Sequence, residues 1–163
     1  MTLIARHWIW LTLLASGAML GAAHAFETFG GLSPCELCLK EREVYWVAMA
    51  VAAAGLVLGF TPVKARRWAC AALALIFLFG AGLATYHAGA EWKFWPGPAS
   101  CSGGAMHASA ADMARLLSGA AMRAPSCDEA VWVFLGLSMA GWNALISLGL
   151  AVSSALAAWA KPT

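Results

Sequence analysis

The chain has 163 residues, of which 62% are hydrophobic and 11% are charged. Soluble domains have about 45–50% apolar and about 25% charged residues, so a water-soluble globular protein is excluded. The same composition excludes a nucleic-acid-binding protein, which needs clustered basic side chains, and an intrinsically disordered chain, which needs low hydrophobicity. We therefore expect a small protein embedded in a lipid bilayer.

Four long runs of the chain contain no Asp, Glu, Lys or Arg. The shortest of them has 20 residues, and about 20 are enough for a helix to cross a bilayer. Helices are favoured because lipid cannot hydrogen-bond to exposed backbone groups and the alternating pattern of barrel strands is missing. We expect an all-α membrane protein, a bundle of four transmembrane helices forming one domain over residues 1–163. The expected spans are about 7–26, 44–63, 68–90 and 130–152, with outer loops at 27–43 and 91–129.

The charged residues indicate how the predicted bundle is oriented. One side carries five basic residues and no acidic ones: Arg6, Lys64, Arg66, Arg67 and Lys161. All eight acidic residues lie in the two loops on the other side. Because basic residues concentrate in short cytoplasmic loops, we expect both termini in the cytoplasm and both loops outside it.

The first span has a second interpretation. Arg6, the apolar stretch after it and Ala23-His24-Ala25 together resemble a secretory signal with an A-x-A cleavage site. The apolar core of such signals has about 7–15 residues, which is shorter than this run and favours a retained span. Cleavage would leave three spans with the same loop orientation.

Cys35 and Cys38 lie in the first outer loop. Ser33-Pro34 before them has the order of a helix start, with Ser as the N-cap and Pro at the first helical position. Cys38 follows Cys35 by three residues and Arg42 follows Cys38 by four, so all three share one helix face. A helix N-terminus and a guanidinium both favour a thiolate, which predicts a reactive cysteine pair. The alternative for Arg42 is a side chain that snorkels to the membrane interface.

Cys101 and Cys127 lie in the second outer loop, among Pro, Gly and Ser residues typical of turns. Outside the cytoplasm they can form a disulfide, either a redox-active bond or a staple that closes the loop. Zinc binding by all four outer cysteines is disfavoured because this pair is 26 residues apart, and we expect no metal. Apolar residues at helical intervals between Met106 and Leu117 predict a short helix on the membrane surface. Cys70 is expected to be a buried apolar residue.

Three segments follow a combined pattern. Pro34-Cys35-Glu36-Leu37-Cys38-Leu39-Lys40-Glu41-Arg42 has the form P-C-x-x-C-x-x-x-R. The next segment is Tyr86-His87-Ala88-Gly89-Ala90-Glu91-Trp92 with Trp95-Pro96-Gly97-Pro98 before Cys101, and the last is Cys127-Asp128-Glu129 with Phe134-Leu135-Gly136-Leu137-Ser138-Met139. In their order and in the position of all four outer cysteines they resemble the DsbB-like disulfide oxidases of bacterial inner membranes. The resemblance covers nearly the whole chain.

The resemblance implies an enzyme, a protein-dithiol:quinone oxidoreductase that forms disulfides. Such an enzyme reoxidises a periplasmic DsbA-like thioredoxin-fold oxidase and passes two electrons to ubiquinone or menaquinone in the bilayer of the inner membrane. By that likeness the partner attacks the Cys101–Cys127 disulfide and Cys101 takes the mixed disulfide. Cys127 then attacks the Cys35–Cys38 bond at Cys35. All four cysteines are therefore expected to be catalytic, with Cys38 passing the electrons on.

Three further residues are expected at the quinone. By the resemblance Arg42 stabilises charge on the thiolate and the quinone, and Met139 occupies a family position near the quinone. His87, near the outer end of the third span, is a candidate hydrogen-bond donor to a quinone oxygen. The alternatives are an ordinary interfacial histidine and a packing methionine.

Alternatives remain open for the function as a whole. The Ala-, Ser- and Gly-rich second loop suits a general DsbA-like partner or a dedicated one, as in the DsbI branch of the family. A second hypothesis is a reductase resembling the vitamin K epoxide reductases, which also place a C-x-x-C on a helical bundle beside a quinone. A third is a membrane protein with two purely structural disulfides.

Overall fold

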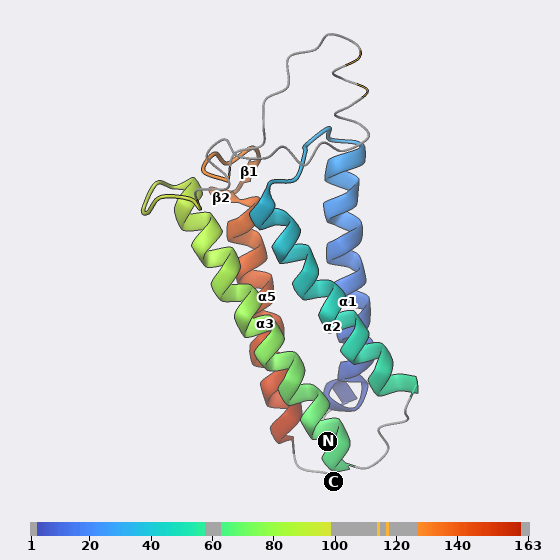
Figure 1. Cartoon of the computed structure of the whole chain (residues 1–163). Helices are drawn as coiled ribbons and strands as arrows, with labels where there is room; N and C mark the ends of the chain where they lie inside the picture. The colour runs from blue at the N-terminus through green and yellow to red at the C-terminus, as the bar shows by residue number, and fades with distance from the viewer. Residues whose placement is uncertain (1–2, 58–62, 99–113, 115–116, 118–126, 161–163) are drawn as a thin grey trace.

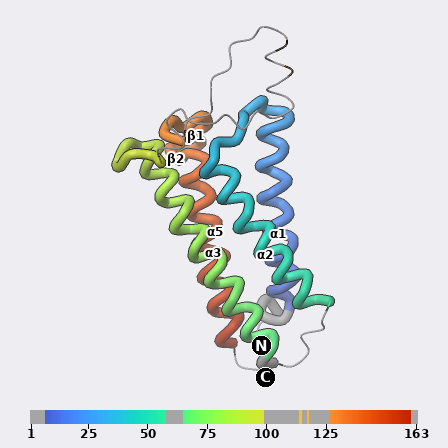
Figure 2. The backbone as a smooth tube through the Cα atoms, viewed as in Figure 1, coloured from blue at the N-terminus to red at the C-terminus, as the bar shows by residue number. Residues whose placement is uncertain are grey.

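The computed structural model describes residues 3–57, 63–98, 114, 117 and 127–160. Within these residues it has four helices and one short hairpin. The helices are α1 (Leu3–Thr28), α2 (Glu36–Val57), α3 (Val63–Glu91) and α5 (Met139–Trp159), and the strands are β1 (Val133–Phe134) and β2 (Leu137–Ser138). Successive helices run in opposite directions along one bundle (Figures 1 and 2). The predicted helical fold is confirmed for the described part of the chain.

Three of these helices contain a stretch that is long and apolar enough to cross a membrane. The stretches are His7–Thr28, Ala65–Glu91 and Met139–Trp159. The described part of α2 does not qualify, because five charged residues occupy its first two turns and only Val44–Val57 are free of charge. The predicted second span, 44–63, continues from there into residues 58–62, which lie outside the described residues. By length and composition, three of the four predicted spans are therefore found.

Small residues fill the contacts between the helices. α1 lies beside α2 and α5, and α3 lies beside α2 and α5. Small side chains let membrane helices approach closely, and large apolar side chains on the outside suit lipid. Buried small residues include Ala48, Ala52, Ala84, Ala151 and Ala157, and exposed large ones include Trp46, Leu75, Phe79, Leu148 and Leu156. The bundle therefore has the packing of a membrane protein.

Cys70 lies in the core near one end of the bundle. It is fully buried, in a cluster with Trp8 and other apolar residues that contains neither Cys35 nor Cys127. Hydrogen bonds join the helices around it: Trp8 Nε1 donates to Ser154 Oγ at 2.9 Å, and Arg67 Nε donates to the Ala158 carbonyl at 3.0 Å. The prediction of a buried, apolar Cys70 is confirmed.

The last helix begins later than the sequence predicts. The charge-free run predicts a span at 130–152, whereas α5 is Met139–Trp159 and a hairpin precedes it. Leu135 and Gly136 turn this hairpin with φ values of 50° and 79°, the backbone that glycine favours in two-residue turns. Ser138 then caps α5 by accepting the Gly141 N–H at 3.1 Å. The absence of charge reveals neither the turn nor the cap, which explains the difference.

The ends of α1 and α3 and the starts of α2 and α5 lie at one end of the bundle (Figure 1). This end brings together Cys35, Cys38 and Cys127, as the predicted topology requires. Cys101 lies outside the described residues, and so does the predicted interfacial helix except for Ala114 and Leu117. Both remain predictions.

Candidate functional site

Cys35 caps helix α2 with its sulfur. The helix begins at Glu36, two residues after the predicted start at Pro34, so the predicted N-cap Ser33 is wrong. Cys35 Sγ accepts the backbone N–H of Cys38 at 3.3 Å, and the Cys35 carbonyl accepts that of Leu39 at 3.1 Å. These are the two bonds of an N-cap residue. The first cysteine therefore lies at the positive end of the helix.

The Cys35–Cys38 pair is in its dithiol form. Both residues are free, and their sulfurs lie 3.0 Å apart, beyond the roughly 2.05 Å of a disulfide. The hydrogen bond from the Cys38 thiol lowers the pKa of Cys35 most strongly; burial opposes this, and the Cys38 backbone N–H lowers it further. The same shared proton, together with burial, raises the pKa of Cys38. In the dithiol the negative charge is therefore favoured on Cys35, at the helix start.

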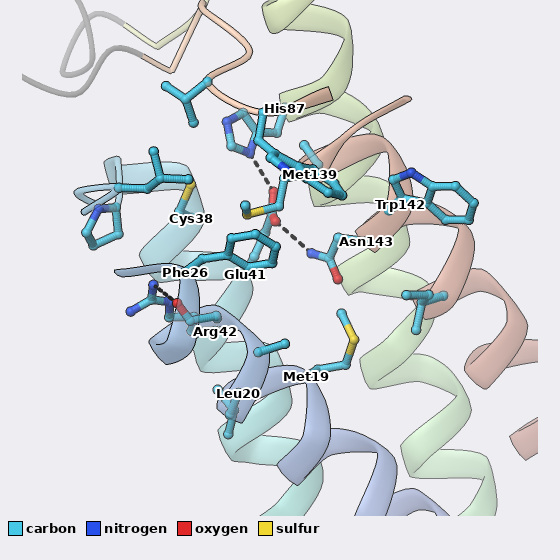
Figure 3. A pocket seen from close by; sticks show the side chains of 18 of the residues that line it. Met19, Leu20, Phe26, Cys38, Glu41, Arg42, His87, Met139, Trp142 and Asn143 are labelled. Carbon is cyan, nitrogen blue, oxygen red and sulfur yellow. Dashed lines mark hydrogen bonds and ion pairs between the residues drawn. The ribbon is translucent and has the colours of Figure 1, made fainter. Parts of the chain in front are cut away.

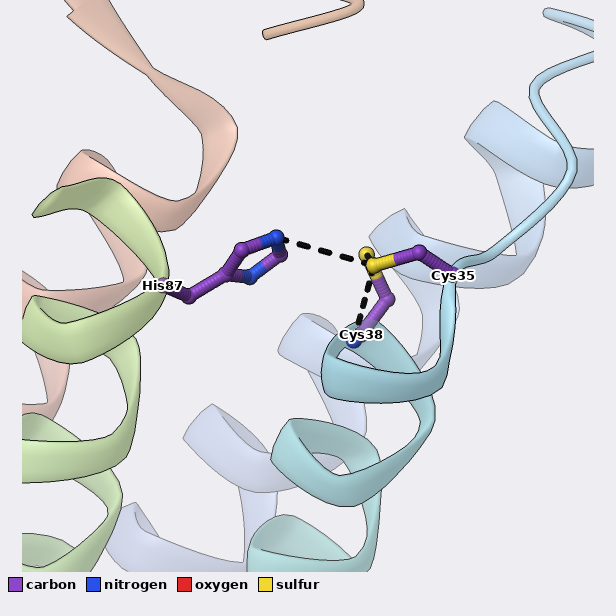
Figure 4. Close-up of side chains that lie close together, drawn as sticks. All are labelled: Cys35, Cys38 and His87. Carbon is purple, nitrogen blue, oxygen red and sulfur yellow. Dashed lines mark hydrogen bonds between the residues drawn. The ribbon is translucent and has the colours of Figure 1, made fainter. Parts of the chain in front are cut away.

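His87 on α3 faces this pair across the bundle (Figure 4). Its Nε2 lies 3.6 Å from Cys35 Sγ, and its Nδ1 lies 2.8 Å from Glu41 Oε1. The other oxygen of Glu41 accepts a hydrogen bond from Asn143 Nδ2 at 2.6 Å. Glu41 therefore connects α2 with α3 and α5. In the neutral tautomer that donates its Nδ1 proton to Glu41, the Nε2 lone pair is directed at the cysteines.

A cavity of about 330 Å³ opens beside Cys38. Its walls are mainly apolar and include side chains from α1, α2 and α5 (Figure 3). Four of the predicted site residues line it, namely Cys38, Arg42, His87 and Met139, and so do Glu41, Glu91 and Asn143. An apolar pocket with a few converging polar groups is the usual form of a small-molecule site.

Arg42 is bound to α1 at the edge of this cavity. Its Nη1 donates to Glu27 Oε2 at 2.7 Å, and its Nη2 donates to the Ala23 carbonyl at 3.2 Å. The side chain is 15% exposed. These two partners anchor Arg42 to α1, so the side chain does more than snorkel to the interface, and its role at a quinone stays a prediction. The bond to the Ala23 carbonyl also ties the end of α1 into the site.

Cys127 lies directly beside the first cysteine pair. It is fully buried in a cluster with Cys35, Leu37 and Cys38. It is disulfide-bonded, and none of the three other described cysteines is its partner. Asp128, the next residue, pairs with Lys93 Nζ at 2.6 Å, and the ammonium lowers the pKa of this carboxyl. The pair joins the residue after Cys127 to the segment that follows α3.

The comparisons with known proteins agree with this geometry. A family model described as disulfide bond formation protein DsbB matches residues 5–157. The chain belongs to the DsbB family. Disulfide bond formation protein B of Methylococcus capsulatus is 29% identical over 163 residues, covering 95% of this chain and 94% of that protein. Disulfide bond formation protein B 2 of Pseudomonas entomophila is 32% identical over 142 residues, covering 85% and 82%. No solved structure matches the chain.

Membership in the DsbB family agrees with the membrane-spanning helices. The family model covers all four helices almost completely. The chain is therefore a membrane-embedded oxidoreductase of the disulfide bond formation family, as the sequence resemblance predicts.

Sequence reasoning missed three polar residues of this DsbB-family site. Glu41 follows Cys38 by three residues, so the helical spacing that singles out Arg42 also applies to it. Glu91 follows His87 by four residues on the same helix, and its Oε1 lies 3.9 Å from His87 Nε2. Asn143 had one weaker signal, a polar side chain within an apolar span. All three lie at the cavity wall.

Proposed function

We propose that the protein is a quinone-coupled disulfide oxidase. It takes two electrons from a periplasmic DsbA-like thiol oxidase and passes them through Cys101 and Cys127, then Cys35 and Cys38, to membrane ubiquinone or menaquinone. One observation carries the proposal: Cys35 packs against the disulfide-bonded Cys127, while Cys38 lines an apolar cavity between helices that cross the membrane. The cysteine pair thus contacts the disulfide-bonded Cys127 on one side and an apolar cavity on the other.

The first half of the reaction is thiol–disulfide exchange. A thiolate of the partner bonds to Cys101 Sγ, the Cys101–Cys127 bond breaks, and Cys127 leaves as a thiolate. Cys127 Sγ then bonds to Cys35 Sγ, and Cys38 leaves as a thiolate on the cavity wall. The second partner thiol and Cys101 resolve the mixed disulfides, so the partner leaves oxidised and Cys35 and Cys38 are reduced. Packing of Cys127 against Cys35 supports this order.

The cavity fits a quinone ring by the chemistry of its lining. Its apolar walls suit the ring, while Arg42 brings N–H groups and His87 brings an imidazole ring to the same space. Arg42 and His87 would hold a quinone there, and it would supply the oxidant that takes up the two electrons and two protons released when the Cys35–Cys38 disulfide forms again. His87 Nε2 takes the proton of the Cys35 thiol, 3.6 Å away, and Glu41 stabilises the resulting imidazolium at Nδ1. In that charged form His87 holds an N–H at the cavity that a quinone oxygen can accept.

The test is a turnover assay with the purified protein in detergent. A reduced thioredoxin-fold partner is supplied with a short-chain ubiquinone or menaquinone, and quinone reduction is followed by absorbance. We expect quinone reduction and partner oxidation in equal amounts. No turnover with either quinone would contradict the oxidase, and quinol oxidation coupled to partner reduction would support the reductase alternative.

Replacing Arg42 by glutamine should weaken quinone use more than partner oxidation. The substitution removes the positive charge at the cavity edge, so we expect the quinone KM to rise roughly 10-fold while the partner KM changes little, a difference of about 1.4 kcal/mol. Initial rates at varied quinone and varied partner concentrations measure both. The matched control is Glu27→Gln, which frees Arg42 from its carboxylate but keeps the charge. A larger rise in the partner KM would contradict the placement of Arg42 beside the quinone.

A further inference from the structure

Cys35, Cys38 and His87 converge on one point that has the donor set of a zinc site. Cys35 Sγ lies 3.0 Å from Cys38 Sγ and 3.6 Å from His87 Nε2, and all three atoms lie within 4.8 Å of one another. Tetrahedral zinc places two sulfur ligands about 3.8 Å apart and a sulfur and a nitrogen about 3.6 Å apart. The sulfur–nitrogen distance already matches, and the two sulfurs need to separate by about 0.8 Å.

Glu91 is not among the residues whose ligand atoms all lie within 4.8 Å of one another, but its carboxylate lies next to His87 and would have to shift to take the fourth position. Its Oε1 lies 3.9 Å from His87 Nε2, where tetrahedral zinc places a nitrogen and an oxygen ligand about 3.4 Å apart. The Glu91 side chain is 6% exposed, and the Ser138 hydroxyl bonds to its carboxyl group, but the Oε2 atom is buried and has no hydrogen-bond partner. Burying a carboxylate oxygen without a partner is costly, and a cation removes that cost. The unpartnered oxygen is an observation independent of the cysteine pair.

The residues behind His87 are arranged as around a metal ligand. Glu41 Oε1 binds Nδ1 at 2.8 Å, and Asn143 holds the other Glu41 oxygen at 2.6 Å. A carboxylate on the far nitrogen of a histidine fixes the ring and directs its free lone pair at a metal ion. Two thiolates and two carboxylates also supply the negative charge that a divalent cation needs in a buried site.

We propose that the reduced protein binds one Zn²⁺ through Cys35 Sγ, Cys38 Sγ, His87 Nε2 and a Glu91 oxygen. Binding releases the two thiol protons and forms two Zn–S bonds, with no change in oxidation state. The oxidised protein lacks the thiolates and does not bind. This site goes beyond the proposed function, and one consequence rests on that function: zinc occupies both sulfurs, so it stops electron transfer until a chelator removes it.

Cobalt(II) titration of the full-length protein in detergent tests the site. Co²⁺ replaces Zn²⁺ in tetrahedral sites and gives intense visible bands and a thiolate charge-transfer band. We expect one Co²⁺ per reduced chain, displaced by Zn²⁺, and none in the oxidised protein. Cys38→Ser should abolish the charge-transfer band expected of two thiolates, and Glu91→Gln should weaken binding at least 10-fold. Circular dichroism checks that both variants fold.

Two controls make the result specific to this cluster. Cys70→Ala, which removes a thiol from a separate core cluster, should bind as the parent does. A Cys101→Ser, Cys127→Ser double variant should also bind cobalt. It lacks the two thiols that reduction of the second pair would release, and these thiols are not ligands of the site. Loss of cobalt in either control, or equal binding by the oxidised protein, would overturn the proposal.

The titration needs neither partner nor quinone, so its outcome is separate from that of the turnover assay. Cobalt binding without turnover would support the zinc site and contradict the oxidase function. Turnover without cobalt binding would support the oxidase function and contradict the zinc site. With both present, micromolar Zn²⁺ should stop turnover in a manner that chelation reverses.

Discussion

Cys38→Ser should abolish quinone reduction, lowering turnover by roughly 10³-fold or more because the sulfur on the cavity wall is the last donor in the chain of thiols. The partner should still form a mixed disulfide with Cys101, since the second cysteine pair is unchanged. The loss is measured as quinone absorbance under partner-driven turnover, and the mixed disulfide is trapped and resolved on a non-reducing gel.

The matched control for this variant is Cys70→Ala. Cys70 is also a free cysteine, but it lies in a core cluster that does not contain the site. We expect its turnover to remain within about twofold of the parent, because surface and core changes away from a site leave its chemistry intact. Turnover that survives in Cys38→Ser, or that falls equally in Cys70→Ala, would remove Cys38 from the proposed pathway.

Glu41→Ala should be the most destabilising of the single substitutions considered. Its carboxylate joins three helices, and removal leaves both His87 Nδ1 and Asn143 Nδ2 without their acceptor. Breaking a buried ion pair or hydrogen-bonded charge costs about 3–5 kcal/mol, so we expect a loss of that order in the free energy of unfolding. Unfolding in detergent, followed by the fluorescence of the tryptophans, measures the change.

Two neighbouring variants show whether the effect comes from the buried carboxylate. Glu41→Gln retains one acceptor oxygen and should lose roughly half as much stability, since one of the two donors keeps a partner. Glu43→Ala removes a carboxylate two positions away that is exposed, and it should change stability by less than about 0.5 kcal/mol. Equal losses in the free energy of unfolding for Glu41→Ala and Glu43→Ala would mean that the contacts of Glu41 with the other helices do not stabilise the protein.

The sequence predicts the helices well because charge is the property that a bilayer excludes. The runs ending at Glu27 and Glu91 coincide closely with the ends of α1 and α3. Where a different signal sets a boundary, the prediction fails. Ser138 caps α5 inside a charge-free run, and the sulfur of Cys35 caps α2 although Ser33 is the more usual capping residue. Caps depend on backbone geometry that composition does not encode.

Helical spacing predicts only those members of the candidate site that share a helix, whereas His87 and Met139 on α3 and α5 are predicted from the place of His87 near the outer end of a span and from the family resemblance. Helical spacing relates Cys35, Cys38 and Arg42, and the structure keeps Cys38 and Arg42 at one cavity wall. The contacts between His87 and Glu41, and between Arg42 and Glu27, join different helices and have no local pattern in the sequence. The packing of Cys127 against Cys35 is likewise a long-range contact, which the family resemblance implies but the spacing of the residues does not.

The sulfur that caps α2 has a consequence for the shape of the protein during turnover. Cys35 Sγ can accept the Cys38 N–H strongly as a thiolate and only weakly once it is bonded to another sulfur. A bond to Cys38 or to Cys127 therefore weakens the first turn of α2, and reduction restores it. The oxidation state of the Cys35 sulfur therefore determines how well ordered the first turn of α2 is. Fraying of this turn would show whether the Cys35–Cys38 pair is oxidised or reduced.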